Sequence, residues 1–387
     1  FTQILAEYEG KADKLHHKLA DLWRFMDKGG WSPSLDRDVR RFNGKLFKDA
    51  DAIPVTEEER RLLQIAAQRD WKDVEPAIFG TLLEQALDPA ERHQLGAHYT
   101  PRAYVERLVA ATIIDPLSED WRNVRAAATQ LREQGKEKEA REEVRAFHLT
   151  LCETRVLDPA CGTGNFLYVA MELMKRLEGE VLELLADLGE TQHLLQLDHH
   201  TVDPHQFLGL EVNPRAVAIA ELVLWIGYLQ WHFRTRGDAM PSSPVLKDFK
   251  NIRAQDAILE YDGREILTDD QGRPVTRWDG ITRKLHPVTG ELVPDETARI
   301  ERYRYLKPRP AEWPEAEFIV GNPPFIGNKR MIDELGEGYV EAIRNAYKDI
   351  PGSVDFVMYW WHKAASVVRN GAARRFGLIT TNTIVQT

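Results

Sequence analysis

The 387-residue sequence has few cysteines and little that resembles a membrane or export segment. Its two cysteines, Cys152 and Cys161, are too few for a disulfide framework, which favours a reducing cytoplasmic setting. The first residues lack the basic-then-apolar pattern of a secretory signal. The longest apolar run, at residues 222–230, is shorter than a bilayer span and is typical of a buried helix. We therefore expect a cytoplasmic protein without a membrane partner.

A net positive charge is also missing. The chain has 51 Lys and Arg against 61 Asp and Glu, a net charge of −10 at pH 7. This balance counts against nucleic-acid binding, because phosphates attract basic surfaces. It is not decisive, since an acidic catalytic domain can work beside a separate basic domain. We find no internal repeat and no nuclease motif, so any cleavage activity would reside outside this chain.

The first part of the sequence predicts a helical domain over residues 1–93. Apolar residues recur there at helical spacing, and Thr56 to Glu59 fits a capping box at the start of one helix. The chain begins with Phe1 and ends soon after residues 376–380, which have the composition of a central strand. We therefore expect that a C-terminal part of a longer parent protein follows.

From residue 94 onward, apolar runs of strand length alternate with helical stretches. This alternation predicts an α/β domain with a mainly parallel sheet over residues 94–387. Two insertions are expected within it, a charged and solvated helical pair at about 118–148 and surface hairpins at about 261–313. The predicted strands are residues 155–157, 207–211, 251–255, 318–320 and 376–380.

The first motif is a glycine turn in residues 156–167, between a predicted strand and a predicted helix. Gly162 and Gly164 allow a sharp turn and close approach of a ligand to the backbone. A dinucleotide fingerprint would place a small residue where Leu167 stands, and Asp158 would repel a pyrophosphate. A carboxylate before the turn suits a cation, so we predict that it binds S-adenosylmethionine through its amino and sulfonium groups.

Acidic residues also follow the next two predicted strands. Glu211 ends the second strand, where its carboxylate can accept hydrogen bonds from both ribose hydroxyls of a nucleoside. Asp256 follows the third strand and can accept from the adenine amino group of the cofactor, or alternatively stabilise a turn. Ligands of open α/β sheets bind beyond the carboxyl ends of the strands, so Asp158, Glu211 and Asp256 are expected to face one nucleoside.

The catalytic candidate is the turn Asn322-Pro323-Pro324-Phe325, which follows a predicted strand. An adenine amino nitrogen is a poor nucleophile because its lone pair is delocalised into the ring. The Asn322 side-chain oxygen and the Pro323 carbonyl can accept both amino hydrogens and localise that lone pair. Pro324 makes the turn rigid, and Phe325 can stack on a base flipped out of the duplex. Neither cysteine is placed as a nucleophile.

With these motifs the chain resembles the gamma-ordered amino-methyltransferases of DNA. It is most similar to type IIG/IIL fused restriction–methylases and to the adenine methyltransferases of DISARM- and BREX-like phage defence. The resemblance implies a Rossmann-like class I S-adenosylmethionine-dependent fold acting on double-stranded DNA with a flipped adenine, beside other restriction or defence subunits or domains. Phe325 is similar to the adenine-modifying members, whereas cytosine-N4 members begin this motif with Ser.

The resemblance also implies the site residues. The family's motif ahead of the sheet matches residues 96–101, which implies that Tyr99 and Thr100 hold the methionine end of the cofactor. The implied catalytic residues are Asn322, Pro323, Pro324 and Phe325. The implied cofactor-binding residues are Tyr99, Thr100, Asp158, Ala160, Gly162, Gly164, Asn165, Phe166, Glu211, Asn213, Asp256 and Ala257.

Two other functions stay open from the residues alone. Asn-Pro-Pro-aromatic turns also occur in methyltransferases of RNA and of protein glutamine, and the chain could be a non-catalytic module that binds cofactor and DNA. A metal site is not expected. The residues 198–200 with Asp203 and His205 have metal-ligand types, but they lack the spacing of zinc sites and are typical of a polar loop.

Overall fold

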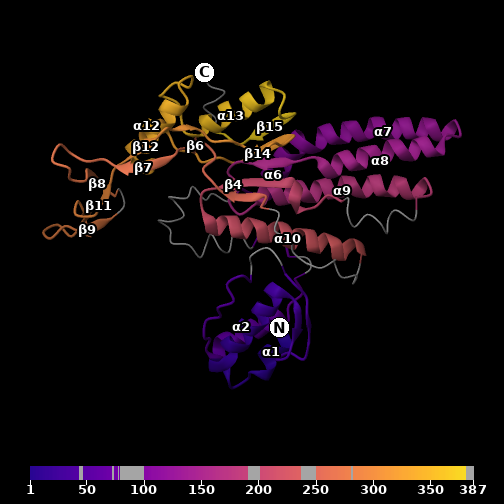
Figure 1. The fold of residues 1–387 in the computed structure, drawn as a ribbon, viewed down its shortest axis with the longest axis horizontal. Coiled ribbons are helices and arrows are strands. Elements are labelled where there is room, and N and C mark those ends of the chain that lie inside the picture. The colour runs from indigo at the N-terminus through magenta and orange to yellow at the C-terminus, as the bar shows by residue number, and fades with distance from the viewer. Residues whose placement is uncertain are drawn as a thin grey trace.

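The computed structural model describes residues 1–42, 47–71, 74–76, 78, 100–190, 201–236, 250–279 and 282–380. A small N-terminal unit lies beside a larger α/β unit (Figure 1). Tyr99, residues 198–200 and the predicted domain boundary at residue 93 lie outside the described residues.

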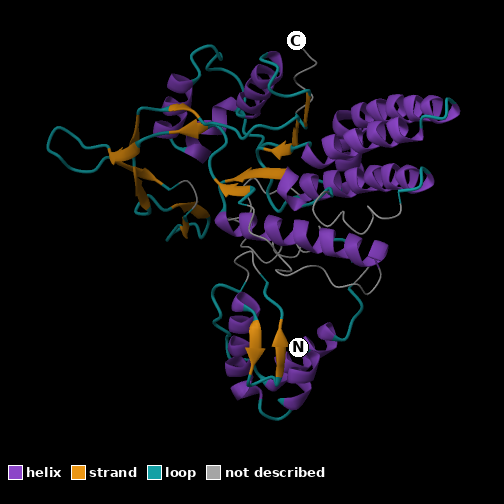
Figure 2. Ribbon diagram, turned by 45° about the vertical axis from the view of Figure 1, so that its right-hand side comes forward, coloured by secondary structure: helices purple, strands orange, loops and turns teal. Residues whose placement is uncertain are grey.

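In the described residues, the N-terminal unit combines three helices with one hairpin (Figure 2). Its elements are α1 (Thr2–Glu7), α2 (Ala12–Lys28), β1 (Gly30–Ser32), β2 (Arg37–Val39) and α3 (Glu57–Ala67). The helices bury Leu5, Leu15 and Leu19 against one another, as their spacing predicted. The capping box is confirmed, because Thr56 Oγ1 accepts from the Glu59 N–H while the Glu59 carboxylate accepts from the Thr56 N–H. The β1–β2 hairpin was not predicted.

The α/β unit is built on a five-stranded parallel sheet. Its strands are β3 (Val156–Asp158), β4 (Phe207–Glu211), β5 (Ile252–Ala254), β14 (Phe318–Gly321) and β15 (Arg375–Leu378). All five predicted strands are therefore confirmed within two residues. The spatial order β5-β4-β3-β14-β15 is 3-2-1-4-5 in chain order, which is the beginning of the doubly wound arrangement. β15 has the composition of a central strand but lies at the edge of the described sheet.

Helices cover both faces of this sheet. The first face carries α6 (Arg102–Val109), the π-helix η1 (Ala110–Ile114), α7 (Asp115–Glu133), α8 (Glu137–Glu153), α9 (Asn165–Asp187) and α10 (Pro214–Arg236). The second face carries η5 (Asn328–Arg330), α11 (Met331–Leu335), α12 (Glu337–Ala346) and α13 (Val357–Arg369). Alternate strand residues supply the two cores, since Phe318 and Val320 pack on the first face and Ile319 on the second.

The first predicted insertion is the helical pair α7–α8, which runs alongside α9 (Figure 1). The prediction of a helical pair is confirmed, but the pair is not simply solvated. Trp121 and Val144 are buried in the same core as the sheet, and the Trp121 ring stacks on Phe147. The pair therefore extends the main core outward, with its charges on the other side.

The second predicted insertion forms an arm of paired strands that projects from the α/β unit (Figure 1). Its strands are β6 (Leu259–Glu260), β7 (Gly263–Ile266), β8 (Thr276–Trp278), β9 (Arg283–Leu285), β10 (Leu292–Pro294), β11 (Arg299–Glu301), β12 (Tyr303–Leu306) and β13 (Arg309–Pro310). They pair antiparallel as β6–β13, β7–β12, β8–β11 and β9–β10, which confirms the predicted hairpins. At its base a Cβ on Gly338 would overlap the Tyr303 carbonyl oxygen, so α12 packs directly on the arm.

The helix α10 corrects the expectation drawn from the short apolar run. Over Pro214–Thr235 it is long and apolar enough, by length and composition alone, to cross a membrane. Core helices of globular domains satisfy the same test. In the structure α10 packs against α9, β4 and β5, and it contributes buried residues to the core of the first sheet face.

Candidate active site

The glycine turn joins the carboxyl end of β3 to the start of α9. Gly162 has φ of 51° and Gly164 has φ of 84°, both in the left-handed region that favours glycine. Gly164 is the N-cap of α9, and a Cβ at this position would lie 3.1 Å from the Ala220 Cβ. The turn thus brings α9 close to α10 and leaves the N–H groups of the first turn of α9 at the edge of the sheet.

Asp158 lies at the centre of this edge with only 1% of its surface exposed. Its Oδ1 accepts from the Ala160 N–H at 3.0 Å, whereas its Oδ2 has no hydrogen-bond partner among the described residues. Burial raises the pKa of Asp158 to about 8, against the Ala160 N–H that lowers it, and the Glu211 charge adds to the rise. A Cβ on Gly321 would lie 2.5 Å from Asp158 Oδ1, so the ends of β3 and β14 meet only because residue 321 is glycine.

Glu211 is held against the glycine turn by backbone donors. Its Oε2 accepts from the Gly162 N–H at 3.0 Å, and its Oε1 accepts from the Asn213 N–H at 2.9 Å. Burial raises the pKa of Glu211, and these N–H groups oppose that rise. Asn213 in turn accepts from the Arg215 N–H at 3.0 Å at the start of α10. The structure therefore brings Asp158, Gly162 and Glu211 together, as the sequence predicted.

Asp256 stabilises a turn, which was the alternative interpretation of this residue. Its Oδ1 accepts from the N–H groups of Ile258 at 2.7 Å and Leu259 at 3.1 Å, and its Oδ2 accepts from the Tyr339 hydroxyl at 2.7 Å. The neighbouring Ala257 is buried, and its carbonyl accepts from Trp313 Nε1 at 2.7 Å. Protein donors thus already engage both oxygens of Asp256.

Besides Asp158 Oδ2, the turn after β14 contains another buried oxygen without a described partner, Asn322 Oδ1. Asn322 Nδ2 donates to Thr100 Oγ1 at 2.9 Å, and Asn322 Oδ1 is buried without a partner among the described residues. Asn165, the first residue of α9, shows the same arrangement. Its Nδ2 donates to the Thr100 carbonyl at 3.1 Å, and its Oδ1 is buried without a described partner. Sequence reasoning placed Thr100 at the site but missed both of these links.

The aromatic residues of the two motifs have different environments. Phe166 is 4% exposed and packs in the core of the first sheet face, so its ring lies beneath the turn rather than at its surface. Phe325 is 39% exposed, while the preceding Pro323 is buried. The chain after Phe325 is fixed, because the Ile326 carbonyl accepts from the Phe356 N–H at 2.9 Å. The Phe325 side chain is therefore partly exposed three residues after Asn322, whose Oδ1 has no described partner.

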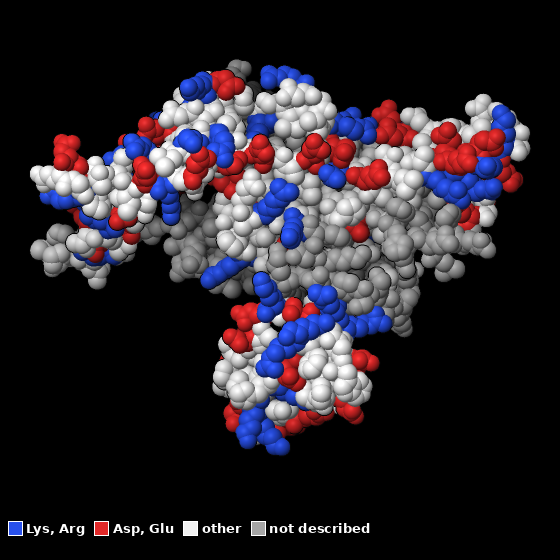
Figure 3. Space-filling model, in the orientation of Figure 1, with Lys and Arg blue, Asp and Glu red and all other residues white. Residues whose placement is uncertain are grey.

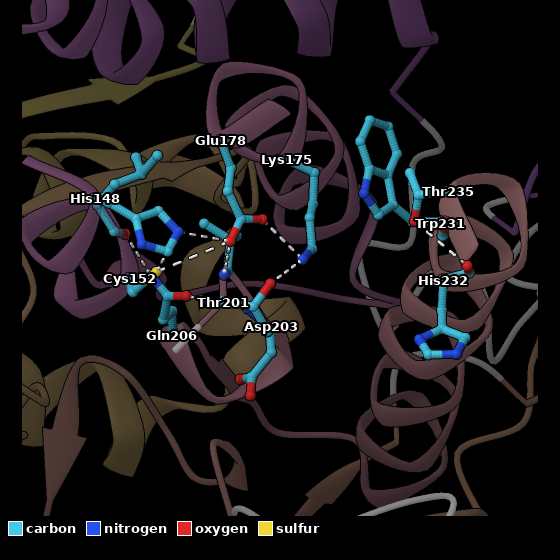
Figure 4. A network of polar contacts seen from close by, with 12 residues as sticks. His148, Cys152, Lys175, Glu178, Thr201, Asp203, Gln206, Trp231, His232 and Thr235 are labelled. Carbon is cyan, nitrogen blue, oxygen red and sulfur yellow. Dashed lines mark hydrogen bonds and ion pairs between the residues drawn. The ribbon is translucent and has the colours of Figure 1, made fainter. Parts of the chain in front are cut away.

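A second buried polar cluster lies away from this edge, between α8 and α9 (Figure 4). Glu178 Oε2 accepts from Lys175 Nζ at 2.9 Å, while its Oε1 lies 3.3 Å from His148 Nε2 and accepts from the Val202 N–H at 3.0 Å. Burial would raise the pKa of Glu178, but the bonds from His148 and Lys175 lower it to about 2. This network is internally satisfied.

The same cluster has residue types that could hold a metal. Ligand atoms of His148, Cys152 and Glu178 lie within 4.8 Å of one another. Burial raises the pKa of the Cys152 thiol far above its usual value, and Lys175 already neutralises Glu178. Because His148 and Lys175 already engage the Glu178 carboxylate, the described contacts fit an ion-pair network. The loop with residues 198–200, Asp203 and His205 was predicted to be polar rather than metal-binding. In its described part, His205 pairs with Asp203.

The sequence and the fold of this chain are similar to those of known proteins. Residues 132–387 match the family described as "MmeI, DNA-methyltransferase domain". The chain belongs to this family. The predicted resemblance to the type IIL branch is thereby confirmed. The α/β fold agrees with a solved structure of the type IIL restriction-modification enzyme MmeI in complex with DNA. That structure has a TM-score of 0.67 and 23% sequence identity, over 99% of this chain and 45% of that one.

Two other relatives of this MmeI-family chain are longer proteins. It is 22% identical over 392 residues to DNA methyltransferase A of Bacillus subtilis, covering 100% of this chain and 38% of that protein. It is 24% identical over 226 residues to a putative type II restriction enzyme and methyltransferase of Methanocaldococcus jannaschii, covering 50% and 19%. The chain therefore spans less than half the length of the relatives that it matches.

Proposed function

We propose that this chain is a Rossmann-like, class I methyltransferase that acts in the cytoplasm. It transfers a methyl group from S-adenosylmethionine to the N6 amino group of adenine in double-stranded DNA, within restriction–modification or phage defence. Residues 1–93 form its helical domain and 94–387 its catalytic domain, which works with other restriction or defence subunits or domains. The observation that carries this proposal is a set of three buried oxygens without described partners, Asp158 Oδ2, Asn165 Oδ1 and Asn322 Oδ1.

These oxygens fit the proposed cofactor. A buried acceptor without a hydrogen bond costs about 1–3 kcal/mol, so several at one sheet edge favour a ligand that brings donors or positive charge. Asp158 and Glu211 make this edge acidic, which suits an ammonium and a sulfonium and opposes a pyrophosphate. The Gly162–Gly164 turn allows the approach, because a Cβ at Gly162 would meet nothing within 4 Å.

Each cofactor role is assigned to a residue by the chemistry that it offers. S-adenosylmethionine, when bound, supplies an electrophilic methyl group. Asp158 accepts from its amino group and Glu211 from its ribose hydroxyls, while Asn213 and Ala160 hold these two carboxylates in place. Of the remaining predicted contacts, Ala257 and Asp256 flank the adenine through the turn after β5, and Phe166 packs beneath the glycine turn. The role of Tyr99, which lies outside the described residues, stays a prediction.

The target amino group is activated by acceptors alone. Asn322 Oδ1 and the Pro323 carbonyl accept its two hydrogens, which draws the nitrogen toward tetrahedral geometry and localises the lone pair. After methyl transfer, the strongly acidic methylated nitrogen loses one of these hydrogens as a proton to solvent. Because no strong base is required, catalysis depends on how rigidly the acceptors are aimed. Rigidity comes from Pro323 and Pro324 and from the Ile379 N–H, which donates to the Gly321 carbonyl at 3.0 Å.

Phe325 supports the choice of a nucleobase as substrate. A base must leave the duplex to reach the edge of the sheet, and stacking on an aromatic face offsets part of the unstacking cost, by about 1–3 kcal/mol per base. The partly exposed Phe325 ring, in the same turn as Asn322, can offer such a face. The net charge of −10 need not repel DNA everywhere, because basic and acidic side chains are interspersed over the described face in Figure 3.

The test is methylation of genomic DNA in a host that lacks its own methyltransferases. The complete gene product is expressed with any partner genes, and N6-methyladenine is quantified by mass spectrometry. We expect signal from the wild type and a loss of at least about 100-fold for Asn322→Ala, since its acceptor is aimed at the transition state. Asn370→Ala, which changes an exposed asparagine after α13, is the matched control and keeps full signal.

Other outcomes would reject the proposal. N4-methylcytosine in place of N6-methyladenine would refute the base, and methylated RNA or protein glutamine would refute the substrate class. If the purified protein binds both S-adenosylmethionine and DNA but modifies nothing, and Asn322→Ala behaves like the wild type, the chain is a binding module without catalysis.

A further inference from the structure

The orientation of the Asn322 side chain decides what the target base meets. An asparagine amide has an acceptor oxygen and a donor NH₂ of nearly the same shape, so a half-turn about its last bond exchanges them. If Nδ2 faced the amino group of the base, donor would face donor and the lone pair would not be localised. Catalysis by Asn322 therefore requires something that holds the NH₂ on the other side.

Thr100 is that partner in the structure. Its Oγ1 accepts from Asn322 Nδ2 at 2.9 Å, which leaves Oδ1 as the end without a described partner. The hydroxyl can accept in this way because its own hydrogen is free to rotate. If the Asn322 amide were turned around, its NH₂ group would face the amino hydrogens of the target base. The hydrogen bond to Thr100 and the target base therefore favour the same orientation of the amide.

The backbone of Thr100 makes a second link of the same kind. Its carbonyl accepts from Asn165 Nδ2 at 3.1 Å, and again the amide oxygen is left buried without a described partner. Asn165 begins α9 directly after the glycine turn, whereas Asn322 follows β14. One residue thus fixes two amides that belong to the cofactor side and the base side of the same edge.

The segment that carries Thr100 is itself anchored. Arg102, two residues further, donates to Glu106 and Glu172 at 2.6 Å each and to Glu75 at 2.8 Å. Charge-assisted bonds of this kind are short and strong, and Glu172 belongs to α9. The hydroxyl of Thr100 is therefore presented from a fixed position relative to the glycine turn.

We propose that Thr100 is a positioning residue for methyl transfer: its hydroxyl holds the Asn322 amide with the oxygen toward the target amino group, and its carbonyl ties this turn to the cofactor turn. This inference rests on the proposed function and changes the role of Thr100, which the resemblance assigned to the methionine end of the cofactor. A positioning role and a binding role predict different kinetics.

The test uses Thr100→Val and Thr100→Ser in the complete gene product. Valine keeps the shape and the backbone carbonyl but removes the hydroxyl, so only the link to Asn322 is lost. We expect the single-turnover rate, at saturating cofactor and DNA, to fall about 10- to 100-fold, because small errors of alignment are costly in such reactions. The dissociation constant of S-adenosylmethionine should stay within about threefold, and Thr100→Ser should restore the rate to within about threefold.

Thr154→Val is the matched control. It also removes a partly buried hydroxyl, which donates to the Thr150 carbonyl at 2.8 Å at the end of α8. Thr154 comes before the start of β3, at the opposite end of that strand from Asp158. We expect it to leave the methyl-transfer rate unchanged within about twofold, as is usual for changes away from a site. A rate loss as large as that of Thr100→Val would mean that any lost hydroxyl is sufficient, and it would overturn the inference.

Three further results would also overturn it. Thr100→Val could retain the wild-type rate, or it could weaken cofactor binding in proportion to the rate, which would return Thr100 to the binding role. Thr100→Ser could be as slow as Thr100→Val, which would point to packing of the methyl group rather than to the hydroxyl. Failure of the proposed function is distinct from all of these, because the wild type itself would then not methylate adenine.

Discussion

Asp158 and Glu178 are both carboxylates with almost no exposed surface, at 1% and 2%, and they lie in the same α/β unit. Their surroundings are opposite. Glu178 is satisfied by Lys175, His148 and the Val202 N–H, and its pKa is lowered to about 2. Asp158 has one backbone donor and one oxygen without a described partner, and its pKa is raised to about 8.

The difference separates a structural network from a candidate ligand site. Buried polar groups are normally hydrogen-bonded, so a satisfied cluster such as that around Glu178 needs no further explanation. A buried carboxylate that the protein leaves half-satisfied, beside two amide oxygens in the same state, is stabilised only if something else supplies donors. On this argument, removing partners at Glu178 costs folding stability, and changing Asp158 costs ligand binding.

The largest expected effect is on the satisfied cluster. Lys175→Met keeps the length of the side chain but leaves Glu178 without its ion pair, and breaking a buried pair costs about 3–5 kcal/mol in the free energy of unfolding. Urea unfolding followed by circular dichroism measures this loss. Lys138→Met, which breaks an exposed pair with Glu142, is the control and should change stability by less than about 1 kcal/mol. Equal losses in the free energy of unfolding for Lys175→Met and Lys138→Met would contradict the distinction between the buried network and an exposed ion pair.

The next effect is on binding at Asp158. Asp158→Asn removes the negative charge but keeps an acceptor for the Ala160 N–H, and we expect the affinity for S-adenosylmethionine to fall about 10- to 100-fold, or about 1.4–2.7 kcal/mol. Isothermal titration calorimetry measures the loss. The melting temperature without cofactor should not fall at neutral pH. A variant that melts lower and binds normally would make Asp158 a structural residue.

The pH dependence of stability follows from the same raised pKa. The folded value of about 8 lies above the ordinary value of 3.8, so the folded protein binds more protons than the unfolded chain between these values. The stabilisation from protonated Asp158 is therefore complete below about pH 4 and is lost as the pH rises through about 8. The Asp158→Asn side chain cannot ionise. The melting temperature of this variant minus that of the wild type should therefore increase from pH 5 to pH 9.

Cofactor binding should show the opposite trend with pH. A cation needs the ionised carboxylate, so the affinity should rise as the pH increases toward 8, and binding near pH 7 should release a proton. Calorimetry in two buffers with different heats of ionisation detects this proton, and Asp158→Asn should abolish it. Proton uptake by the wild type would contradict the assignment.

The smallest effect is expected in the N-terminal unit, far from both carboxylates. Thr56→Ala removes one bond of the capping box at α3 and should cost about 1 kcal/mol, whereas Thr56→Ser should cost little. Chemical unfolding again measures the change. Because Thr56 lies outside the α/β unit, cofactor affinity and methyl transfer should not change, and a change in either would tie this unit to the site.

Much of the fold followed from local patterns. Strand-length apolar runs predicted β3, β4, β5, β14 and β15 because a strand buried on both faces must be apolar throughout. The parallel order then places the strand ends at one edge, which is how Asp158, Glu211 and Asp256 could be grouped before any contact was known. The β1–β2 hairpin and the burial of the α7–α8 pair were missed, since short strands and a mostly charged helix carry weak signals.

In the candidate site, local sequence patterns predicted the residue types but not their contacts. Residue types determined that acidic and amide side chains would gather beyond the strands and that glycines would shape the turn. Only the tertiary structure decided that Asp256 is already engaged with Tyr339, that the Phe166 ring lies in the core, and that Asn165 and Asn322 share Thr100. The reason is physical. Hydrogen bonds across 65 and 222 positions of the chain depend on how distant segments pack, and local sequence carries no record of which partner a buried amide will meet.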